Sequence, residues 1–208
     1  MKQLNRAAQG EVYWADGFVD QAACARIMEE LEYCFWSPST VVSRNLEGAL
    51  HNHLSRSRRS ESTCEAWFST PLRRETLRIG RRLSRELGQP LDRFEPWQVT
   101  RYGIGEWFGY HCDSGLWGDD PAGERRTTVI LYVQAPRSGG ATHFCEFGLE
   151  VAPAPGRLVV FHNLLPDGSC NRQMIHSSLP VRRGRKVTLV TWIRERAVRT
   201  ATQQKEGL

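Results

Sequence analysis

The chain has 208 residues without internal repeats or low-complexity tracts, a length that suits one domain with a core of its own. Hydrophobic residues make up 40% of it and charged residues 25%, which is the composition of an ordinary soluble protein. No apolar run approaches the length of a membrane span, and the first residues contain no apolar signal segment. We therefore expect no membrane partner, no transmembrane helix and no secretory signal peptide.

The chain carries a net charge of +5, and the basic excess lies mainly in residues 56–93 and 182–199. A basic face can bind nucleic acid or an anionic substrate or co-substrate, and it can equally be a solvated arginine-rich surface. The six cysteines form no C-x-x-C pair and suggest no disulfide framework. Reduced thiols and a cytoplasmic location are therefore expected.

The N-terminal part predicts a short strand at residues 11–14 and then a helix. Asp20 is a good N-cap, because its side chain can accept a hydrogen bond from a backbone N–H of the first turn. Apolar residues then recur at helical spacing, at Ala23, Ile27 and Leu31. We expect this helix to end near residues 33–36, before Ser37-Pro38.

A second helix is predicted from Thr70 to Gly88. Thr70 would cap it, Pro71 would take its first position, and Gly88 would end it. One face of this helix is formed by Leu72, Thr76, Ile79, Leu83 and Leu87. The arginines of the helix lie mostly on other faces, so we interpret it as a scaffold helix with its basic side in water.

Residues 37–62 are dominated by Ser, Arg, Asn and His, with a short strand predicted only at 40–43. His51-Asn52-His53 could supply two metal ligands, but no nearby carboxylate or cysteine completes such a site. A solvated loop is the simpler interpretation. Because loops of this kind often cover a site, we expect the segment to serve as a lid.

From residue 95 the pattern changes to short β-rich segments separated by Gly, Pro, Asp and Asn. The predicted strands are 97–102, 107–111, 127–134, 141–147, 149–151, 158–162, 174–179 and 186–193. Such strands predict a mainly β sandwich or jelly roll, with the preceding helices packed on one outer face. We expect one domain over 1–208, with helical support at about 16–94, a β core at about 95–194 and a frayed tail at 197–208.

His111 and Asp113 stand two residues apart in a predicted strand, so their side chains would point to the same side. They could be two ligands of a metal site, and a third would come from the opposite side of the barrel mouth. The candidates are His143, His162 and His176. Two histidines and one carboxylate on one face, with three positions open, form the facial triad of non-haem Fe(II) oxygenases.

Lys186 begins the last predicted strand, in which side-chain alternation places Lys186, Thr188, Val190 and Trp192 on one face. An inward Lys186 could pair with the far carboxylate of a 2-oxo acid, and Thr188 could donate a hydrogen bond to it. A buried lysine without an anion would be costly, so an inward Lys186 implies a bound anion. The alternative is a surface lysine at the end of the basic run 182–186.

Further motifs follow in a characteristic order. They are Arg101-Tyr102 with Gly105 and His111-Cys112-Asp113; Arg126-Thr127-Thr128 with Leu131-Tyr132-Val133; Gly139-Gly140-Ala141-Thr142-His143-Phe144; Pro155-Gly156 with Phe161-His162-Asn163; and His176, Pro180-Val181, Gly184, Lys186 and Trp192. Over about residues 16–194 this order and spacing resemble the prolyl 4-hydroxylase-like group of Fe(II)/2-oxoglutarate dioxygenases. Ala141 departs from the pattern, because the family often has an acidic residue there.

The resemblance implies a double-stranded β-helix, which is a cupin-like jelly roll, with two or three N-terminal helices packed on one sheet. It implies Fe(II) held by His111, Asp113 and His176, with 2-oxoglutarate and O2 as co-substrates and ascorbate as a support of activity. It implies Lys186 as the partner of the 2-oxoglutarate C5 carboxylate. The same pocket would be lined by Tyr102, Tyr132, Thr142, Thr188 and Trp192.

On this resemblance we expect a dioxygenase that hydroxylates an unactivated C–H bond and releases succinate and CO2. The substrate would be a small molecule in a natural-product tailoring role, an amino acid or a peptide, with a prolyl peptide among the candidates. Arg126, Trp117 and Trp107 are candidates for contact with it. Residues 37–66 and 114–125 match no family motif, so they do not indicate which substrate is accepted.

Two other functions stay open. Nucleic-acid oxidative demethylation is one, because related oxygenases act on methylated bases and this chain is basic, although Lys186 and Trp192 fit the hydroxylases better. A catalytically silent sensor domain is the other, and the complete triad and lysine argue against it. We expect no nucleic-acid partner and a monomer or homodimer.

Overall fold

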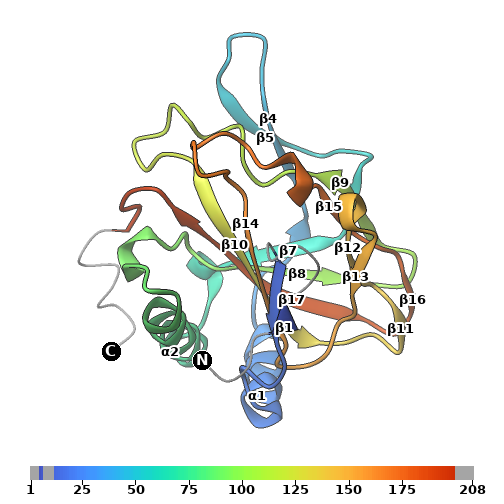
Figure 1. The fold of residues 1–208 in the computed structure, drawn as a ribbon. Helices are drawn as coiled ribbons and strands as arrows, with labels where there is room; N and C mark the ends of the chain where they lie inside the picture. The colour runs from blue at the N-terminus through green and yellow to red at the C-terminus, as the bar shows by residue number, and fades with distance from the viewer. Residues whose placement is uncertain (1–4, 7–11, 200–208) are drawn as a thin grey trace.

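The computed structural model of the protein describes residues 5–6 and 12–199, which contain two α-helices and seventeen strands (Figure 1). The helices are α1 (Gln21–Leu31) and α2 (Thr70–Leu87). The strands are β1 (Asn5–Arg6), β2 (Val12–Ala15), β3 (Ser37–Pro38), β4 (Val41–Arg44), β5 (Leu50–His53), β6 (Arg58–Arg59), β7 (Glu61–Cys64), β8 (Gln98–Tyr102), β9 (Trp107–His111), β10 (Arg125–Gln134), β11 (Ser138–Gly139), β12 (Thr142–Phe144), β13 (Leu149–Val151), β14 (Leu158–His162), β15 (His176–Ser178), β16 (Val181–Arg183) and β17 (Lys186–Arg194).

Most of these strands belong to two antiparallel sheets (Figure 1). The larger sheet has the order β1-β2-β14-β10-β17-β8-β7-β3, and the smaller sheet has the order β13-β12-β15-β9-β6. The pairs β11-β16 and β4-β5 form two separate ladders. Two packed sheets with helices at one side are the mainly β, jelly-roll architecture that the sequence predicts.

Side-chain alternation along β10 explains how the layers pack. Val129, Leu131 and Val133 point to the outer face of the larger sheet, where they join one core cluster with buried residues of α1 and α2. Ile130 and Tyr132 point the other way, into a second cluster that includes residues of the smaller sheet. The helices therefore cover the outer face, and the space between the sheets is left for a functional site.

Helix α1 begins at the residue that its cap predicts. Asp20 Oδ1 accepts a hydrogen bond from the backbone N–H of Ala23 at 2.6 Å, and the predicted apolar stripe is buried. The helix ends at Leu31, before the expected 33–36. The next backbone N–H groups bond only three residues back, from Tyr33 to Glu30 and from Cys34 to Leu31, so the chain tightens into a turn there.

Helix α2 is capped one residue earlier than predicted. Ser69, and not Thr70, has the extended backbone of a cap, and its hydroxyl accepts from the Leu72 N–H at 3.3 Å. Gly88 ends the helix as predicted, in the left-handed conformation with φ of 63°. The predicted apolar face is confirmed, because Leu72, Thr76, Ile79 and Leu83 are buried.

The short strand predicted at 40–43 is confirmed by β4, but the loop predicted for the rest of residues 37–62 is wrong. The segment contributes β3 and β7 to the larger sheet and β6 to the smaller one, while β4 and β5 form a hairpin that projects from the body of the protein (Figure 1). His51 and His53 lie on β5 with stacked rings whose centroids are 4.9 Å apart. The support at 16–94 is therefore partly β-sheet and not only helical.

Two other expected segments differ at their ends. The strand expected at 141–147 covers only Thr142–Phe144 before a 3-10 turn at Cys145–Phe147, and the strand expected at 174–179 covers His176–Ser178. The tail is not frayed where it is described, because Arg199 pairs with Glu65 at 2.6 Å. Residue 11 of the first predicted strand and residues 200–208 of the tail lie outside the described residues.

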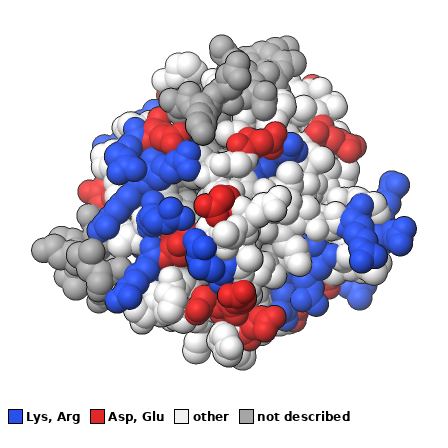
Figure 2. Space-filling view, turned by 90° about the horizontal axis from the view of Figure 1, so that it is seen from below, with Lys and Arg blue, Asp and Glu red and all other residues white. Residues whose placement is uncertain are grey.

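Seen from the side of α1 and α2, the surface carries basic and acidic side chains interspersed (Figure 2). On α2, Arg78 pairs with Glu75 at 2.5 Å and Arg82 with Glu86 at 2.7 Å. Part of the helix's basic charge is thus balanced within the helix. Neither described helix combines the length and the apolar character needed to cross a membrane.

Candidate metal centre

A cavity of about 580 Å³ brings together residues that are far apart in the sequence. Both sheets contribute to its lining, through β8, β9, β10, β15 and β17 among other strands. The β4–β5 hairpin and residues 116–117 line it as well. The cavity therefore lies where the predicted lid segment and residues 116–117 meet the β core.

Three potential metal ligands, His111, Asp113 and His176, converge in this cavity. His111 ends β9, and His176 begins β15, where the two residues are partners across the ladder. The prediction that Asp113 shares a strand with His111 is wrong, because β9 ends at His111. The Asp113 carboxylate nevertheless lies close to both imidazole rings. Its Oδ1 lies 3.6 Å from His111 Nε2, and its Oδ2 lies 3.7 Å from His176 Nε2.

The other two candidates for the third ligand lie outside this group of ligands. His143 Nδ1 shares a hydrogen bond of 2.8 Å with the hydroxyl of Tyr110. His162 Nδ1 lies 3.1 Å from Thr127 Oγ1. Burial is the largest of the causes that raise the pKa of the Cys112 thiol to about 11.

Backbone carbonyls fix the orientation of both imidazoles. His111 Nδ1 lies 2.8 Å from the carbonyl of Gly109, and His176 Nδ1 lies 2.9 Å from the carbonyl of Met174. Because a carbonyl oxygen only accepts, each Nδ1 must carry the proton and donate it. Each Nε2 then presents a lone pair toward Asp113, which is the tautomer that a metal requires.

The charge states of the group suit a divalent metal. Burial and the neighbouring His176 lower the pKa of His111 to about 3, so its ring is neutral at neutral pH. Burial would raise the pKa of Asp113, but favourable electrostatic interactions with His176, His111 and Arg125 outweigh this effect and hold the pKa at about 2. Thr128 Oγ1 also donates to Asp113 Oδ2 at 2.7 Å. Two neutral imidazoles and an ionised carboxylate on one side are the donor set that fits Fe(II).

Lys186 is the second polar feature of the cavity, and it is only 1% exposed. Its Nζ donates to the carbonyl of Gly140 at 2.9 Å and to the hydroxyl of Ser178, and it lies 4.3 Å from the ring centroid of Tyr102. Burial is the cause that lowers the pKa of Lys186 to about 7, with no carboxylate among the described residues to oppose it. An anionic ligand would supply the missing counter-charge.

The residues expected beside Lys186 fall into two groups. Tyr102 and Thr142 line the cavity, and burial raises the pKa of Tyr102. Tyr132 does not line it, because its fully buried hydroxyl shares a 2.6 Å hydrogen bond with Thr142 Oγ1. Tyr132 therefore supports Thr142 from behind in this structure.

Strand β17 follows the predicted alternation. Lys186, Thr188, Val190 and Trp192 all line the cavity. Thr188 Oγ1 lies 3.5 Å from the carbonyl of Thr100, so its hydroxyl makes at most a long hydrogen bond within the protein. The strand thus presents a hydroxyl next to the buried amine and an indole further along.

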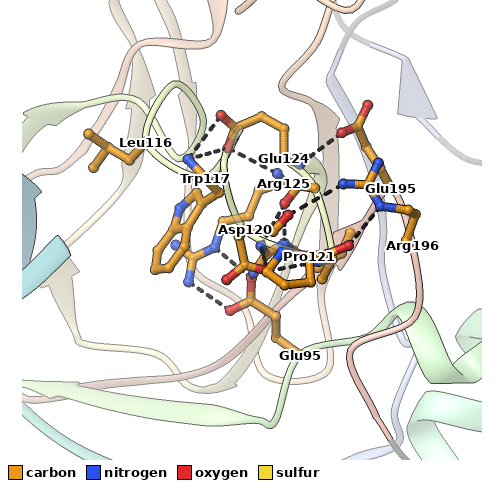
Figure 3. Close-up of polar contacts among 12 residues, drawn as sticks. Glu95, Leu116, Trp117, Asp120, Pro121, Glu124, Arg125, Glu195 and Arg196 are labelled. Carbon is orange, nitrogen blue, oxygen red and sulfur yellow. Dashed lines mark hydrogen bonds and ion pairs between the residues drawn. The ribbon is translucent and has the colours of Figure 1, made fainter. Parts of the chain in front are cut away.

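Arg125, which the sequence reasoning missed, takes the place in the cavity expected for Arg126. Arg126 is exposed, whereas the Arg125 guanidinium lies 3.7 Å from the ring centroid of Trp192 and 4.5 Å from that of Trp117. Glu95 accepts from Arg125 Nε at 2.8 Å and from Nη2 at 2.7 Å (Figure 3). This arginine is therefore held between two indoles and a carboxylate.

Of the two remaining candidates for substrate contact, one lines the cavity and the other does not. Trp117 lines the cavity, together with Leu116 from the same loop. Trp107 does not line it. Arg58 does, and its guanidinium lies 4.4 Å from the ring centroid of Phe108. Arg58 comes from β6, within the segment for which the sequence predicts a lid.

The amino-acid sequence is similar to known proteins. A sequence profile of the 2OG-Fe(II) oxygenase superfamily matches residues 97–194. The prolyl 4-hydroxylase subunit alpha-1 of Homo sapiens is 30% identical over 165 residues, covering 76% of this chain and 29% of the relative. That of Gallus gallus is 33% identical over 138 residues, covering 63% of this chain and 27% of the relative. The chain thus spans less than a third of the length of these relatives.

Solved structures resemble most of the chain. The 2OG complex of the viral collagen prolyl hydroxylase from Paramecium Bursaria Chlorella virus-1 matches with a TM-score of 0.67 and 23% identity, covering 89% of this chain and 97% of the other. A prolyl-4-hydroxylase from Pseudomonas putida matches with a TM-score of 0.56 and 18% identity, covering 90% of this chain and 94% of the other. These likenesses establish the fold.

Proposed function

Because the chain belongs to the 2OG-Fe(II) oxygenase superfamily, we propose that it hydroxylates an unactivated C–H bond with consumption of 2-oxoglutarate and O2 and release of succinate and CO2. One observation carries the proposal. The buried amine of Lys186, which has no carboxylate partner among the described residues, shares one cavity with His111, Asp113 and His176. A metal-ligand group and an unbalanced buried cation together fit a co-substrate with two carboxylates.

In this proposal His111, Asp113 and His176 hold Fe(II), which when bound supplies the oxidising chemistry that no amino-acid side chain provides. The carbonyls of Gly109 and Met174 keep both Nε2 lone pairs directed at the metal position. Thr128 fixes the carboxylate of the site through its hydrogen bond to Asp113. The chain itself thus contributes orientation and charge.

Lys186 binds the C5 carboxylate of 2-oxoglutarate, with Ser178 and Thr188 as neighbouring hydroxyl groups. Val190 and Trp192 continue the same face of β17 and limit the access of water to the ligand. An ion pair formed in such a buried place is screened little by solvent. The geometry therefore favours a co-substrate whose second carboxylate reaches Lys186.

We propose a prolyl residue in a peptide as the substrate. The relatives reported above are named prolyl 4-hydroxylases, which supports this choice. The cavity wall beyond the metal ligands, with Trp117, Arg125 and Trp192, offers apolar faces and hydrogen-bond donors that suit a peptide. We also propose a cytoplasmic location, which the six free cysteines support, and a monomer or homodimer.

The test is turnover by the purified protein with Fe(II), 2-oxoglutarate, ascorbate and a set of proline-containing peptides. Mass spectrometry should find peptide product with one additional oxygen atom, in step with succinate formation, and His111→Ala should form neither. Free proline and a methylated oligonucleotide serve as alternative substrates. Succinate with oxygen transfer only to free proline would refute the peptide substrate, and demethylation of the oligonucleotide would refute hydroxylation of peptides.

A further inference from the structure

The guanidinium of Arg44 joins two segments that line the cavity, the β4–β5 hairpin and the loop of residues 115–124. Arg44 ends β4, and its Nη2 donates to the carbonyl of Leu116 at 2.9 Å and to Asp119 Oδ2 at 2.9 Å. Its Nη1 donates at 2.7 Å to Gly48 in the turn of its own hairpin. The β4–β5 hairpin and the loop of residues 115–124 are thereby bridged, although they lie far apart in the sequence.

The 115–124 loop is fixed at its base (Figure 3). The Glu124 carboxylate accepts from the backbone N–H of Gly115 at 2.9 Å and of Trp117 at 3.1 Å. Glu195 Oε2 accepts from the Glu124 N–H at 2.9 Å, and Arg196 Nε donates to the carbonyl of Pro121 at 2.7 Å. These bonds hold the loop to the chain that follows β17.

A buried arginine adds to this anchorage. Arg194 is 3% exposed, and it donates to the carbonyl of Gly123 at 2.9 Å through Nε and pairs with Asp120 at 2.9 Å. Arg125, which follows the loop, is held by Glu95 and lies against Trp117. These contacts hold the 115–124 loop and its Trp117 in place beside the cavity.

The hairpin is attached much more weakly. β4 and β5 pair only with each other, and the turn between them is closed by bonds among residues 45–49. Of the hydrogen bonds made by residues 41–53, those of Arg44 are the ones that reach another described part of the chain. The hairpin still lines the cavity through Val41, Val42, Leu50, His51 and Asn52.

We propose that Arg44 is a positioning residue that governs the access of peptide substrates, because it latches a movable hairpin to a fixed loop. The Arg44 side chain is 37% exposed and that of Asp119 is 88% exposed. An exposed ion pair stabilises only weakly, so this latch can open to admit a peptide and close over it. The substrate part of this inference rests on the proposed function, whereas the latch itself does not.

Hydrogen exchange tests the latch without any substrate. In Arg44→Ala the backbone amides of residues 41–53 should exchange up to about fivefold faster, which corresponds to the loss of a weak exposed ion pair. The amides of residues 115–124 should not change, because their bonds to residues 194–196 remain. Arg56→Ala is the matched control, since Arg56 is exposed and makes no polar contact with the described residues. Equal acceleration in both segments, or none in the hairpin, would overturn the proposal.

Thiol labelling tests the access to the cavity. Cys112 borders the cavity, whereas Cys145 is partly exposed, does not line the cavity and serves as the reference thiol in the same sample. Arg44→Ala should raise the labelling rate of Cys112 relative to Cys145 by about the same factor as the hairpin exchange. Asp119→Asn should give a smaller rise, because the bond to the Leu116 carbonyl remains. An unchanged ratio in both variants would contradict the latch.

Kinetics test the link to substrate. With a peptide that the turnover assay shows to be a substrate, Arg44→Ala should raise the KM for the peptide several-fold and leave the KM for 2-oxoglutarate unchanged. A parallel rise in both values would refute a role confined to peptide access. If the wild-type protein hydroxylates no peptide, the proposed function fails, and the exchange and labelling results still decide whether the latch exists.

Discussion

Lys186 shows how one buried side chain can set the binding of a co-substrate. Burial lowers its pKa to about 7, and we propose that the carboxylate of 2-oxoglutarate binds the charged amine. Below this pKa the amine is already protonated. Above it, each binding event must take up a proton, so we expect the Kd for 2-oxoglutarate to rise about tenfold per pH unit between about pH 7 and 9. Calorimetric titration of the Fe(II)-loaded protein under anaerobic conditions measures this dependence.

Lys186→Arg provides the control for this titration, because a guanidinium keeps its charge over the whole range. Its Kd should be nearly independent of pH, even if its absolute affinity is lower. A wild-type Kd that is also independent of pH would show that Lys186 is not the binding partner. The same slope in the variant would assign the pH dependence to another group.

Thr128 should influence the affinity of the site for Fe(II). Its hydroxyl donates to Asp113 and accepts a 2.8 Å hydrogen bond from Asn163 Nδ2. Thr128→Val removes the support of the metal-binding carboxylate, and we expect the Fe(II) affinity to fall about tenfold. A direct Fe(II) titration measures it. Thr127→Val is the matched control, because the Thr127 hydroxyl is close to His162 and not to Asp113. Equal losses in both variants would contradict the assigned role.

Residues inside regular strands were predictable, and those beside irregularities were not. Alternation along β17 identified Lys186 and Trp192 correctly as residues of one face. On β10 the register shifts between Arg125 and Thr127, so a bulge interrupts alternation there. Arg126 was a candidate because it stands in a family motif, and the sequence carries no signal for the bulge that brings Arg125 to the cavity instead.

At the scale of elements, the cap of α1 gives a stability prediction. Asp20→Ala removes the acceptor for the Ala23 N–H, and we expect the free energy of unfolding to fall by about 1 kcal/mol. Urea denaturation monitored by circular dichroism measures the loss. Asp20→Asn should retain most of the stability, because an asparagine also caps helices. A full loss in this second variant would mean that charge, and not capping, stabilises the helix start.

Elements with strong periodicity were predicted well, and short strands of polar residues were not. The core strands β9, β14 and β17 lie where the apolar patterns placed them. The strands β3 to β7 are formed by a segment rich in Ser and Arg, and they pair at sheet edges or with each other. Such strands need no apolar alternation, because few of their side chains enter a core. Their pairing depends on partners elsewhere in the chain.

At the scale of the whole molecule, two sheets bring the two halves of the site together. The proposed metal ligands come from β9, the bend that follows it and β15 in the smaller sheet, whereas Lys186 comes from β17 in the larger one. Helices on the outer face leave the space between the sheets to the cavity. From the sequence, the proximity of Lys186 to the proposed metal ligands could be predicted only through the resemblance to a known fold. It depends on pairings between strands far apart in the chain, which no local sequence pattern encodes.

Binding of 2-oxoglutarate under anaerobic conditions, measured by calorimetry with and without Fe(II), tests the central claim most directly. The account predicts one site per chain that requires Fe(II), is lost in Asp113→Ala and is weakened strongly in Lys186→Met. Absence of O2 keeps the ligand intact, so binding is observed apart from turnover. Binding that is equally strong without the metal, or unchanged in both variants, would contradict the assignment of the cavity.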